Sequence, residues 1–254
     1  MARTLAASPR RDISRKAGGA GRTAAITLVA VLLFAGFVAL GVWQLQRLAW
    51  KTDLIERVEA RVHAAPAPAP GPAAWPAIAR SADEYRRVAA RGVYLPGEDT
   101  LVQAVSGLGG GYWVLSPLRT DQGFVVLVNR GFVPPDQRQA PPAPPAGEQQ
   151  VTGLLRISEP RGGFLRANEP AADRWRSRDV AAIAARRSLS DVAPYFIDAE
   201  VPAGAPSDAW PRAGLTVVRF SNNHLGYAFT WFGLALATVV GWRIALRHGR
   251  SGGE

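Results

Sequence analysis

The chain of 254 residues has no cysteine, one methionine and three histidines, which excludes disulfides, thiolate catalysis and cysteine-based metal sites. Its net charge of +10 is uneven, with +5 in residues 1–23, +2 in residues 243–254 and only +3 in the long middle of the chain. A nucleic-acid-binding face would place the basic residues on the folded part, whereas basic tails beside apolar segments follow the positive-inside pattern of membrane proteins.

Residues 1–23 are basic, rich in glycine and alanine and without apolar periodicity, so we expect a disordered cytoplasmic tail. The next 20 residues, Ala24 to Trp43, are apolar and long enough to cross a hydrocarbon core of roughly 30 Å. A cleaved signal peptide is the alternative, because it also joins a basic start to an apolar run. No small-x-small cleavage site follows and the segment ends in polar Gln44 and Arg47, so we predict a retained transmembrane helix over 24–45.

The helical spacing continues beyond the membrane, as an extension over residues 46–63. Trp43, Arg47 and Trp50 fall at i, i+4 and i+7 and share one helix face. That face is either a binding surface or an anchor at the membrane interface. Residues 64–76 (AAPAPAPGPAAWP) then predict an extended, proline-rich spacer.

Residues 77–220 contain short runs with the composition of β-strands. The strongest is Phe124–Asn129, which follows Asp121-Gln122-Gly123, a hairpin signal, while one helix is expected over Asp179–Arg187. Seven short strands with turn signals predict a mainly antiparallel sheet closed on itself, a small barrel or sandwich. The other expected strands are Arg87–Leu95, Thr100–Val105, Tyr112–Leu118, Gln150–Ile157, Tyr195–Asp198 and Leu215–Phe220.

A second transmembrane helix is predicted over 224–244, with an uncharged run from Leu225 to Trp242, before a basic tail over 245–254. Both tails would then be cytoplasmic and the central β domain extracytoplasmic. At 100° per residue, one face of this helix carries His224, Tyr227, Ala228, Trp231, Ala235 and Thr238. A separate strip repeats small residues every fourth position (Gly233, Ala237 and Gly241), as Ala35 and Ala39 do in the first helix, which predicts close helix approach.

Catalytic and nucleotide-binding motifs are missing from the sequence, and the glycine-rich Gly107–Gly111 precedes a strand, so we expect a flexible hairpin loop there. His63 and His248 are expected to be solvated. His224 begins a membrane helix, and an ionisable group in that position is a functional-site hypothesis. An imidazole among aromatic rings with a nearby cation suits haem, with His224 on the iron and Arg47 on a propionate. Helix packing and interface anchoring explain the same residues, which also include Trp43, Gln44, Trp50, Tyr227 and Trp231.

A series of motifs occurs along the chain in this order: Gly41–Lys51 (GVWQLQRLAWK), Tyr85-Arg86 through Arg91-Gly92, Val128–Pro134 (VNRGFVP), Asn168-Glu169-Pro170 with Trp175 and Asp179, Phe196-Ile197-Asp198, and Asn223–Trp231 (NHLGYAFTW). Together, and in the same order, they resemble the Surfeit-locus family of cytochrome c oxidase assembly factors. The resemblance covers about residues 37 to 245 and leaves out both tails and the two proline-rich loops. Between Gly162 and Asn168 the chain has leucine and arginine where that family often has proline.

The resemblance implies a non-enzymatic protein of the bacterial plasma membrane or inner mitochondrial membrane that helps to place haem a in the catalytic subunit of the oxidase. It implies that His224 is the haem-binding histidine and that haem a synthase is a possible partner. For Asn129-Arg130-Gly131 and for Trp175 with Asp179 we expect structural roles, as a strand-ending turn and a helix start. The alternative function is a cofactor-free membrane scaffold for an oxidase assembly intermediate. A copper carrier is disfavoured, because Met1 is the only soft ligand.

Overall fold

The computed structural model describes residues 12–163, 166–202, 204, 206, 208–216 and 222–251. The chain forms two compact units, one of Met1–Ile55 with Phe220–Glu254 and one of Glu56–Arg219. The first unit consists of long helices, and the second is built around a sheet.

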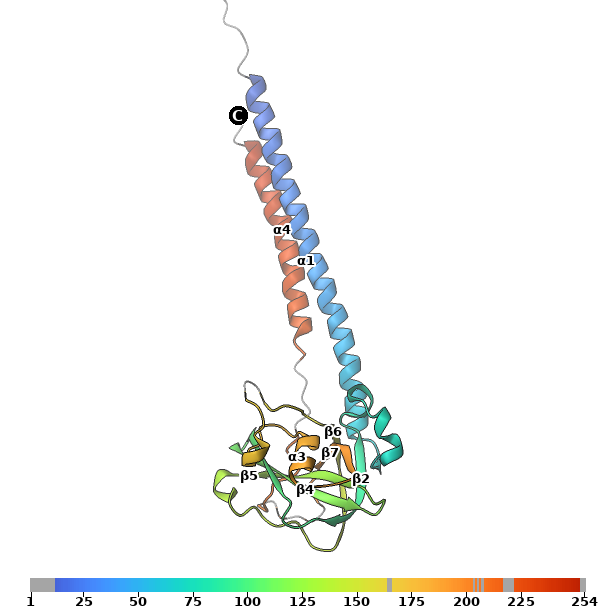
Figure 1. The fold of residues 1–254 in the computed structure, drawn as a ribbon. Helices are drawn as coiled ribbons and strands as arrows, with labels where there is room; N and C mark the ends of the chain where they lie inside the picture. The colour runs from blue at the N-terminus through green and yellow to red at the C-terminus, as the bar shows by residue number, and fades with distance from the viewer. Residues whose placement is uncertain are drawn as a thin grey trace, which may run out of the picture. The chain divides into compact units, whose positions relative to one another are not determined.

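The helical unit pairs α1 (Asp12–Val62), which continues into the second unit, with α4 (His224–Ser251). The helices lie side by side and antiparallel (Figure 1), since Gln44 contacts His224 at one end of the pair and Thr27 contacts Trp242 at the other. Because α1 begins at Asp12, the prediction of disorder is wrong for residues 12–23, while residues 1–11 lie outside the described residues. Residues 12–23 contain no proline to end the helix, so the apolar helix propagates backwards through them despite the low helix propensity of Gly18, Gly19 and Gly21.

Both helices present large apolar side chains outward. Examples are Leu32 in α1 and Leu236 in α4, which are 63% and 66% exposed. Two segments, Gly21–Val62 and His224–His248, are long and apolar enough to cross a bilayer. In lipid such side chains are covered by acyl chains, so the helical pair fits a membrane protein.

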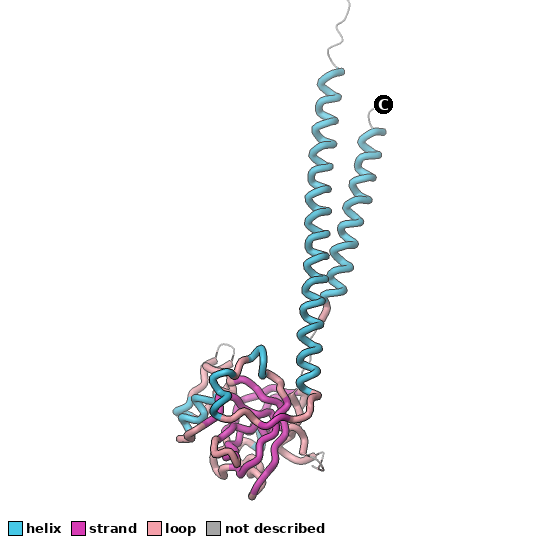
Figure 2. Tube along the Cα trace, turned by 90° about the vertical axis from the view of Figure 1, so that its right-hand side faces the viewer, coloured by secondary structure: helices cyan, strands magenta, loops and turns pink. Residues whose placement is uncertain are grey.

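The second unit contains a seven-stranded sheet in the order β1-β2-β6-β7-β5-β4-β3. An additional pairing of β2 with β4 closes five of these strands into a barrel, with β3 outside it on β4 and β1 beside β2. Figure 2 shows the strands of this unit gathered together, with loops and short helices around them. The strands are β1 (Ala67–Pro68), β2 (Arg87–Tyr94), β3 (Thr100–Ser106), β4 (Gly109–Thr120), β5 (Val125–Val133), β6 (Glu148–Ile157) and β7 (Val192–Ala199). The short helices are η1 (Pro72–Ala77), α2 (Arg80–Asp83), η2 (Pro135–Gln137), η3 (Pro170–Ala172) and α3 (Val180–Arg186).

The barrel closes at Gly92, where β2 is paired with both β6 and β4. A Cβ at this residue would lie 2.1 Å from the carbonyl oxygen of Arg119, so only glycine allows the strands to approach this closely. Most neighbouring strands are antiparallel, but β5 and β7 are parallel, as are β1 and β2. The expected closed, mainly antiparallel sheet is confirmed, and it is a barrel rather than a sandwich.

Alternate residues of β5 and β7 face two separate apolar clusters, as a period of two requires. Val126 and Val128 of β5 join Tyr195 and Ile197 of β7 in one cluster. Leu127 and Phe196, on the opposite faces of the same strands, join a second cluster with Trp175 and with Val180 and Ile183 of α3. The α3 helix therefore covers one outer face of the sheet, and Asp179 caps it by accepting a hydrogen bond from the Ala182 backbone N–H.

Several details differ from the sequence-based expectation. The glycine-rich stretch is mostly strand, because β4 begins at Gly109 and only Gly107 and Leu108 separate it from β3. The proline-rich spacer contains β1 and most of η1 instead of being uniformly extended. Of the strand predicted over Leu215–Phe220, residues 215 and 216 are not strand, and residues 217–220 lie outside the described residues.

Asn129, Arg130 and Gly131 lie inside β5, so the prediction that they form a strand-ending turn is wrong. The opposing strand shifts register between Val114 and Leu115, and Gly131 adopts a φ of +133°, which is the signature of a bulge. The Asn129 side chain stabilises this irregularity by accepting a hydrogen bond from the Gly131 N–H at 3.1 Å. The motif is structural, as expected, although not in the expected place.

Candidate functional site

His224, the first residue of α4, faces Gln44 of α1. Its Nδ1 lies 2.7 Å from Oε1 of Gln44, and the Gln44 side chain is buried. An amide oxygen can only accept a hydrogen bond, so Nδ1 must carry the proton and donate it. When the ring is in its neutral form, this assignment leaves Nε2 with a lone pair, and a free lone pair can bind a metal ion.

The chain just before α4 contributes one more unsatisfied polar group. Oδ1 of Asn222 is buried and finds no hydrogen-bond partner among the described residues. Asn223 is exposed, and its carbonyl oxygen accepts a hydrogen bond from the Tyr227 N–H at 3.3 Å, which starts the helix. Residues 222–224 therefore combine an available acceptor with an available imidazole nitrogen.

Below His224, the helices pack through small and aromatic residues. Ala228 and Ala235 are 2% and 3% exposed, and the Trp231 ring stacks on Phe37 with centroids 5.8 Å apart. A Cβ added at Gly41 would lie 2.7 Å from the Phe232 ring, so this glycine lets the ring approach the α1 backbone. Ala228, Trp231 and Ala235 of the predicted face therefore meet α1, on the same side of α4 as the contact between His224 and Gln44.

The other predicted site residues are not gathered around His224. Trp43, Trp50 and Tyr227 are 48%, 50% and 56% exposed, and the Arg47 guanidinium lies 4.6 Å over the Trp50 ring on α1 itself. Of the α1 residues predicted to face His224, Gln44 alone makes a hydrogen bond to it among the described residues. Arg47 and the exposed rings instead lie on an outward surface.

The small-residue strip predicted to bring the helices together does not do so. A Cβ at Gly233 or Gly241 would meet nothing within 4 Å, and Ala35, Ala39 and Ala237 are exposed. The close approach occurs at Gly41 and at the buried alanines of the His224 face instead. The prediction is wrong because α4 can turn only one of its two strips toward α1. The strip that carries the aromatic rings buries more apolar area in the interface, so that strip faces α1.

The chain was also compared with known protein families and proteins. The family model described as the SURF1 family matches residues 31–236. The chain belongs to the SURF1 family. It is 36% identical over 225 residues to Surfeit locus protein 1 of Homo sapiens, covering 80% of this chain and 71% of the relative. It is 35% identical to the protein of Mus musculus, with 84% and 72% covered, and 34% identical to a SURF1-like protein of Monosiga brevicollis, with 92% of each covered.

The region matched to the SURF1 family includes both partners of the Gln44–His224 pair and the whole barrel. Sequence reasoning missed two members of the helix interface, Phe37 and Phe232. Phe37 could have been found, because it lies seven residues before Gln44 and four before Gly41, on the same α1 strip. Phe232 follows Trp231 directly, so the 100° rule places it beside the predicted face.

A second polar cluster of this SURF1 family member surrounds Asp198, which is 3% exposed. Its carboxylate accepts hydrogen bonds from Arg156 Nη1 at 2.6 Å, Asn129 Nδ2 at 2.8 Å and Arg178 Nη1 at 3.2 Å. Thr216 donates a further bond at 2.9 Å. Burial alone would lower the pKa of Arg156, but the charges of Asp198 and Glu84 outweigh it and raise the pKa. All partners are satisfied, so this cluster holds the barrel together rather than binding a ligand.

The remaining histidines agree with the expectation of solvated side chains. His63 lies 3.1 Å from Glu59 of the same helix in an exposed pair, and His248 contacts its own helix backbone. Within the part of the chain that the structure describes, no three metal-ligating side chains of histidine or carboxylate type gather together.

Proposed function

We propose that this protein is a cytochrome c oxidase assembly factor that holds haem a through His224 on its way to the catalytic subunit. The observation that carries the proposal is the 2.7 Å contact between Nδ1 of His224 and Oε1 of Gln44. Metal-binding histidines characteristically donate their other ring N–H to a carbonyl or carboxylate oxygen, which fixes the tautomer and raises the basicity of the ligating nitrogen. Membership of the SURF1 family supports the oxidase role.

The residues fit an imidazole-ligated haem. Haem would supply an iron that accepts an imidazole ligand, and His224 Nε2 is the group that would hold it. Gln44 would orient the ring, while Phe37 and Trp231 would keep the two helices together. The exposed Arg47 guanidinium and the exposed rings of Trp43, Trp50 and Tyr227 are secondary contacts in this proposal, available to a propionate and to the macrocycle, respectively.

The spacing of polar contacts along α4 supports a location across a membrane, which in this proposal is the bacterial plasma membrane. His224 and Trp242, which both bond to α1, are separated by about 27 Å at 1.5 Å per residue. A hydrocarbon core is roughly 30 Å thick, so the two contacts would lie at its two boundaries. An antiparallel pair returns the chain to its starting side, and the basic tails indicate that this side is cytoplasmic. The central domain would then be extracytoplasmic, with the catalytic subunit as partner and haem a synthase as a possible haem donor.

A cofactor-free scaffold is the second candidate, because the same hydrogen bond also joins two helices that bury Ala228 and Ala235. In that case His224 would only hold α1 and α4 together while the barrel stabilises an oxidase intermediate. In the first function Nε2 of His224 binds the haem iron, whereas in the scaffold function it binds nothing. They can be separated by removing the ring and measuring haem content and oxidase assembly independently.

The deciding experiment is to purify the full chain in detergent from cells that make haem a, and to measure its optical spectrum and haem stoichiometry. We expect bound haem a in the natural protein, a loss of most of it in His224→Ala, and no loss in the matched control His248→Ala on the same helix. Full haem in His224→Ala would exclude the ligand role. Normal oxidase assembly by that variant would favour the scaffold.

A further inference from the structure

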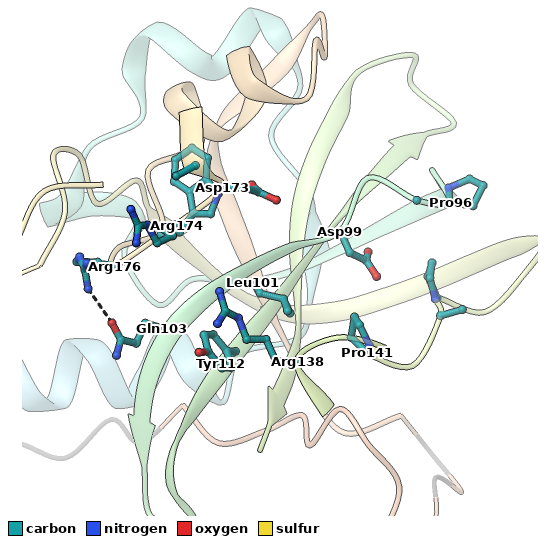
Figure 3. Close-up of a pocket in the computed structure, with 15 residues that line it drawn as sticks. Pro96, Asp99, Leu101, Gln103, Tyr112, Arg138, Pro141, Asp173, Arg174 and Arg176 are labelled. Atoms are coloured by element: carbon teal, nitrogen blue, oxygen red, sulfur yellow. Dashed lines mark hydrogen bonds between the residues drawn. The ribbon is translucent and has the colours of Figure 1, made fainter. Parts of the chain in front are cut away.

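The barrel unit carries a cavity of about 680 Å³ beside the hairpin of β3 and β4. Its floor includes Leu101 and Gln103 of β3 and Tyr112 of β4, with the loop around Arg138 to Pro144 on one side and residues 172–176 on another (Figure 3). Gln103 and Tyr112 are directly paired across the two strands, so their side chains share a face. This volume is that of a small-molecule pocket.

The two carboxylates that line the cavity are already neutralised. Asp99 pairs with Arg130 at 3.0 Å, and Ser116 donates to it. Asp173 pairs with Arg187 at 2.8 Å and accepts a hydrogen bond from the indole N–H of Trp175 at 2.8 Å. Burial alone would raise the pKa of Asp173, but the hydrogen bonds from Trp175 and Arg187 outweigh it and hold the pKa below its usual value. Neither carboxylate therefore leaves negative charge to balance the remaining arginines of the cavity.

Three arginines line the same cavity with too few acidic partners. Arg174 and Arg176 share one carboxylate, that of Glu169, at 2.6 and 3.2 Å. Nε of Arg176 is buried and has no hydrogen-bond partner among the described residues. The Arg138 guanidinium lies 5.3 Å over the Tyr112 ring and forms no ion pair within the described part of the chain. The cavity thus combines surplus positive charge with an aromatic and aliphatic floor.

We propose that this cavity binds an organic anion that carries two carboxylates on a flat apolar body. The guanidinium fork matches a carboxylate in two parallel hydrogen bonds, which favours Arg138 and the exposed Arg174 as the groups that recognise the two ends, since Arg176 already donates to Gln103 and Glu169. Tyr112 and Leu101 would cover the apolar body, which a simple inorganic oxyanion lacks. The site lies wholly in the barrel unit, and it is independent of the haem proposal.

The test is calorimetric titration of the full chain in a nonionic detergent, at low ionic strength, with benzene-1,3-dicarboxylate. We expect saturable binding of one molecule, little binding of the uncharged diamide of the same ring, and weaker binding of inorganic phosphate. In Arg138→Ala the affinity should fall about tenfold or more, because a hydrogen bond to a charged group is lost. Arg138→Glu should abolish binding, while Arg119→Ala, which removes an exposed arginine of β4 outside the cavity, should leave it unchanged.

Three results would overturn the proposal. The first is the absence of saturable binding by the natural protein, and the second is an equal loss in Arg138→Ala and Arg119→Ala. The third is equal affinity for phosphate and the aromatic dianion, which would show a site for oxyanions without any recognition of an organic body. Circular dichroism of each variant confirms that the barrel is folded, and Arg138 is exposed enough for its removal to be tolerated.

Discussion

The helical unit and the barrel each bury a polar centre, and the two centres are built in opposite ways. Asp198 in the barrel is surrounded by two arginines, an asparagine and a threonine, all of which donate to it. Among the residues that the structure describes, His224 in the helical unit has one hydrogen-bond partner, Gln44, and keeps one ring nitrogen available. The first centre has no capacity left for a ligand, whereas the second has.

Whether a buried polar group has all its hydrogen bonds satisfied therefore distinguishes a structural group from a candidate binding group better than its burial does. A buried carboxylate is tolerated only when its charge is compensated, and the compensation itself makes the group chemically inert. A neutral imidazole needs no such compensation, so it can sit half-buried with its Nε2 unused. We therefore expect removal of Asp198 to lower the stability of the barrel, and removal of the His224 ring to lower ligand binding.

The largest effect is expected from Asp198→Ala. This change leaves the guanidiniums of Arg156 and Arg178 near Asp198 without their shared anion, and breaking a buried ion pair from one side costs about 3–5 kcal/mol. We expect the denaturant midpoint of the barrel to fall sharply, measured by tryptophan fluorescence of the full chain. Asp121→Ala, at an exposed turn, is the control, and equal destabilisation by both changes would contradict the structural role.

A smaller, pH-dependent effect is expected from Tyr94, which faces the barrel interior. Burial raises the pKa of its phenol to about 12, and Arg130 acts weakly in the opposite direction. The folded state therefore holds this proton more tightly than the unfolded chain, whose phenol titrates near pH 10. The contribution to stability is complete below about pH 10 and is lost as the pH rises toward 12, by about 2 kcal/mol.

Tyr94→Phe removes that titration. We expect denaturation curves of the variant and the natural protein to run parallel from pH 7 to about 10 and then to converge or cross, because only the natural protein loses this contribution. An unchanged alkaline slope in Tyr94→Phe would mean that the phenol ionises as easily in the barrel as in water. Tyr195, whose pKa burial also raises, retains its own alkaline effect in both proteins.

Much of this architecture could be predicted from the sequence because it rests on local patterns. The branched run at Phe124–Asn129 and the alternation from Arg87 identify strands whichever partners they have. The order of strands could not be predicted, since the closure at Gly92 depends on where the chain returns 27 residues later, at Arg119. Charge networks such as that of Asp198 are hidden for the same reason, because their members come from β5, β6 and β7 and the segments around them.

The candidate site was predicted in part. Helical periodicity identified the face of α4 that carries His224, and it placed Gln44 near the same membrane boundary. It could not choose between Gln44 and its neighbours Trp43 and Arg47, which lie within three positions of it on α1. That choice depends on the rotation of α1, which is set by the close fit of Gly41 against Phe232.

This fit can be broken without touching either polar centre. Gly41→Val inserts a branched side chain where a Cβ already meets the Phe232 ring at 2.7 Å, and such overpacking costs about 1–3 kcal/mol. Gly36→Val makes the same change where nothing lies within 4 Å. Spin labels at Leu33→Cys and Leu236→Cys, in a chain with no native cysteine, should report a longer or broader interhelical distance only with Gly41→Val. Equal distances in both variants would show that the helices are not held by this contact.

The smallest effect is expected from a change at Gln44, which tests whether this residue prepares the free nitrogen of His224 for a ligand. Gln44→Leu keeps the approximate volume but removes the acceptor for the Nδ1 proton, so the ring loses its fixed tautomer and orientation. Loss of such a partner lowers metal affinity by about 10–100-fold, so we expect haem a to dissociate faster while barrel stability is unchanged. Gln44→Glu should restore most of the binding, because a carboxylate oxygen also accepts the Nδ1 proton. If the Gln44→Leu and Gln44→Glu variants retain haem equally, Gln44 serves only to pack the helices, and its hydrogen bond to His224 does not affect haem binding.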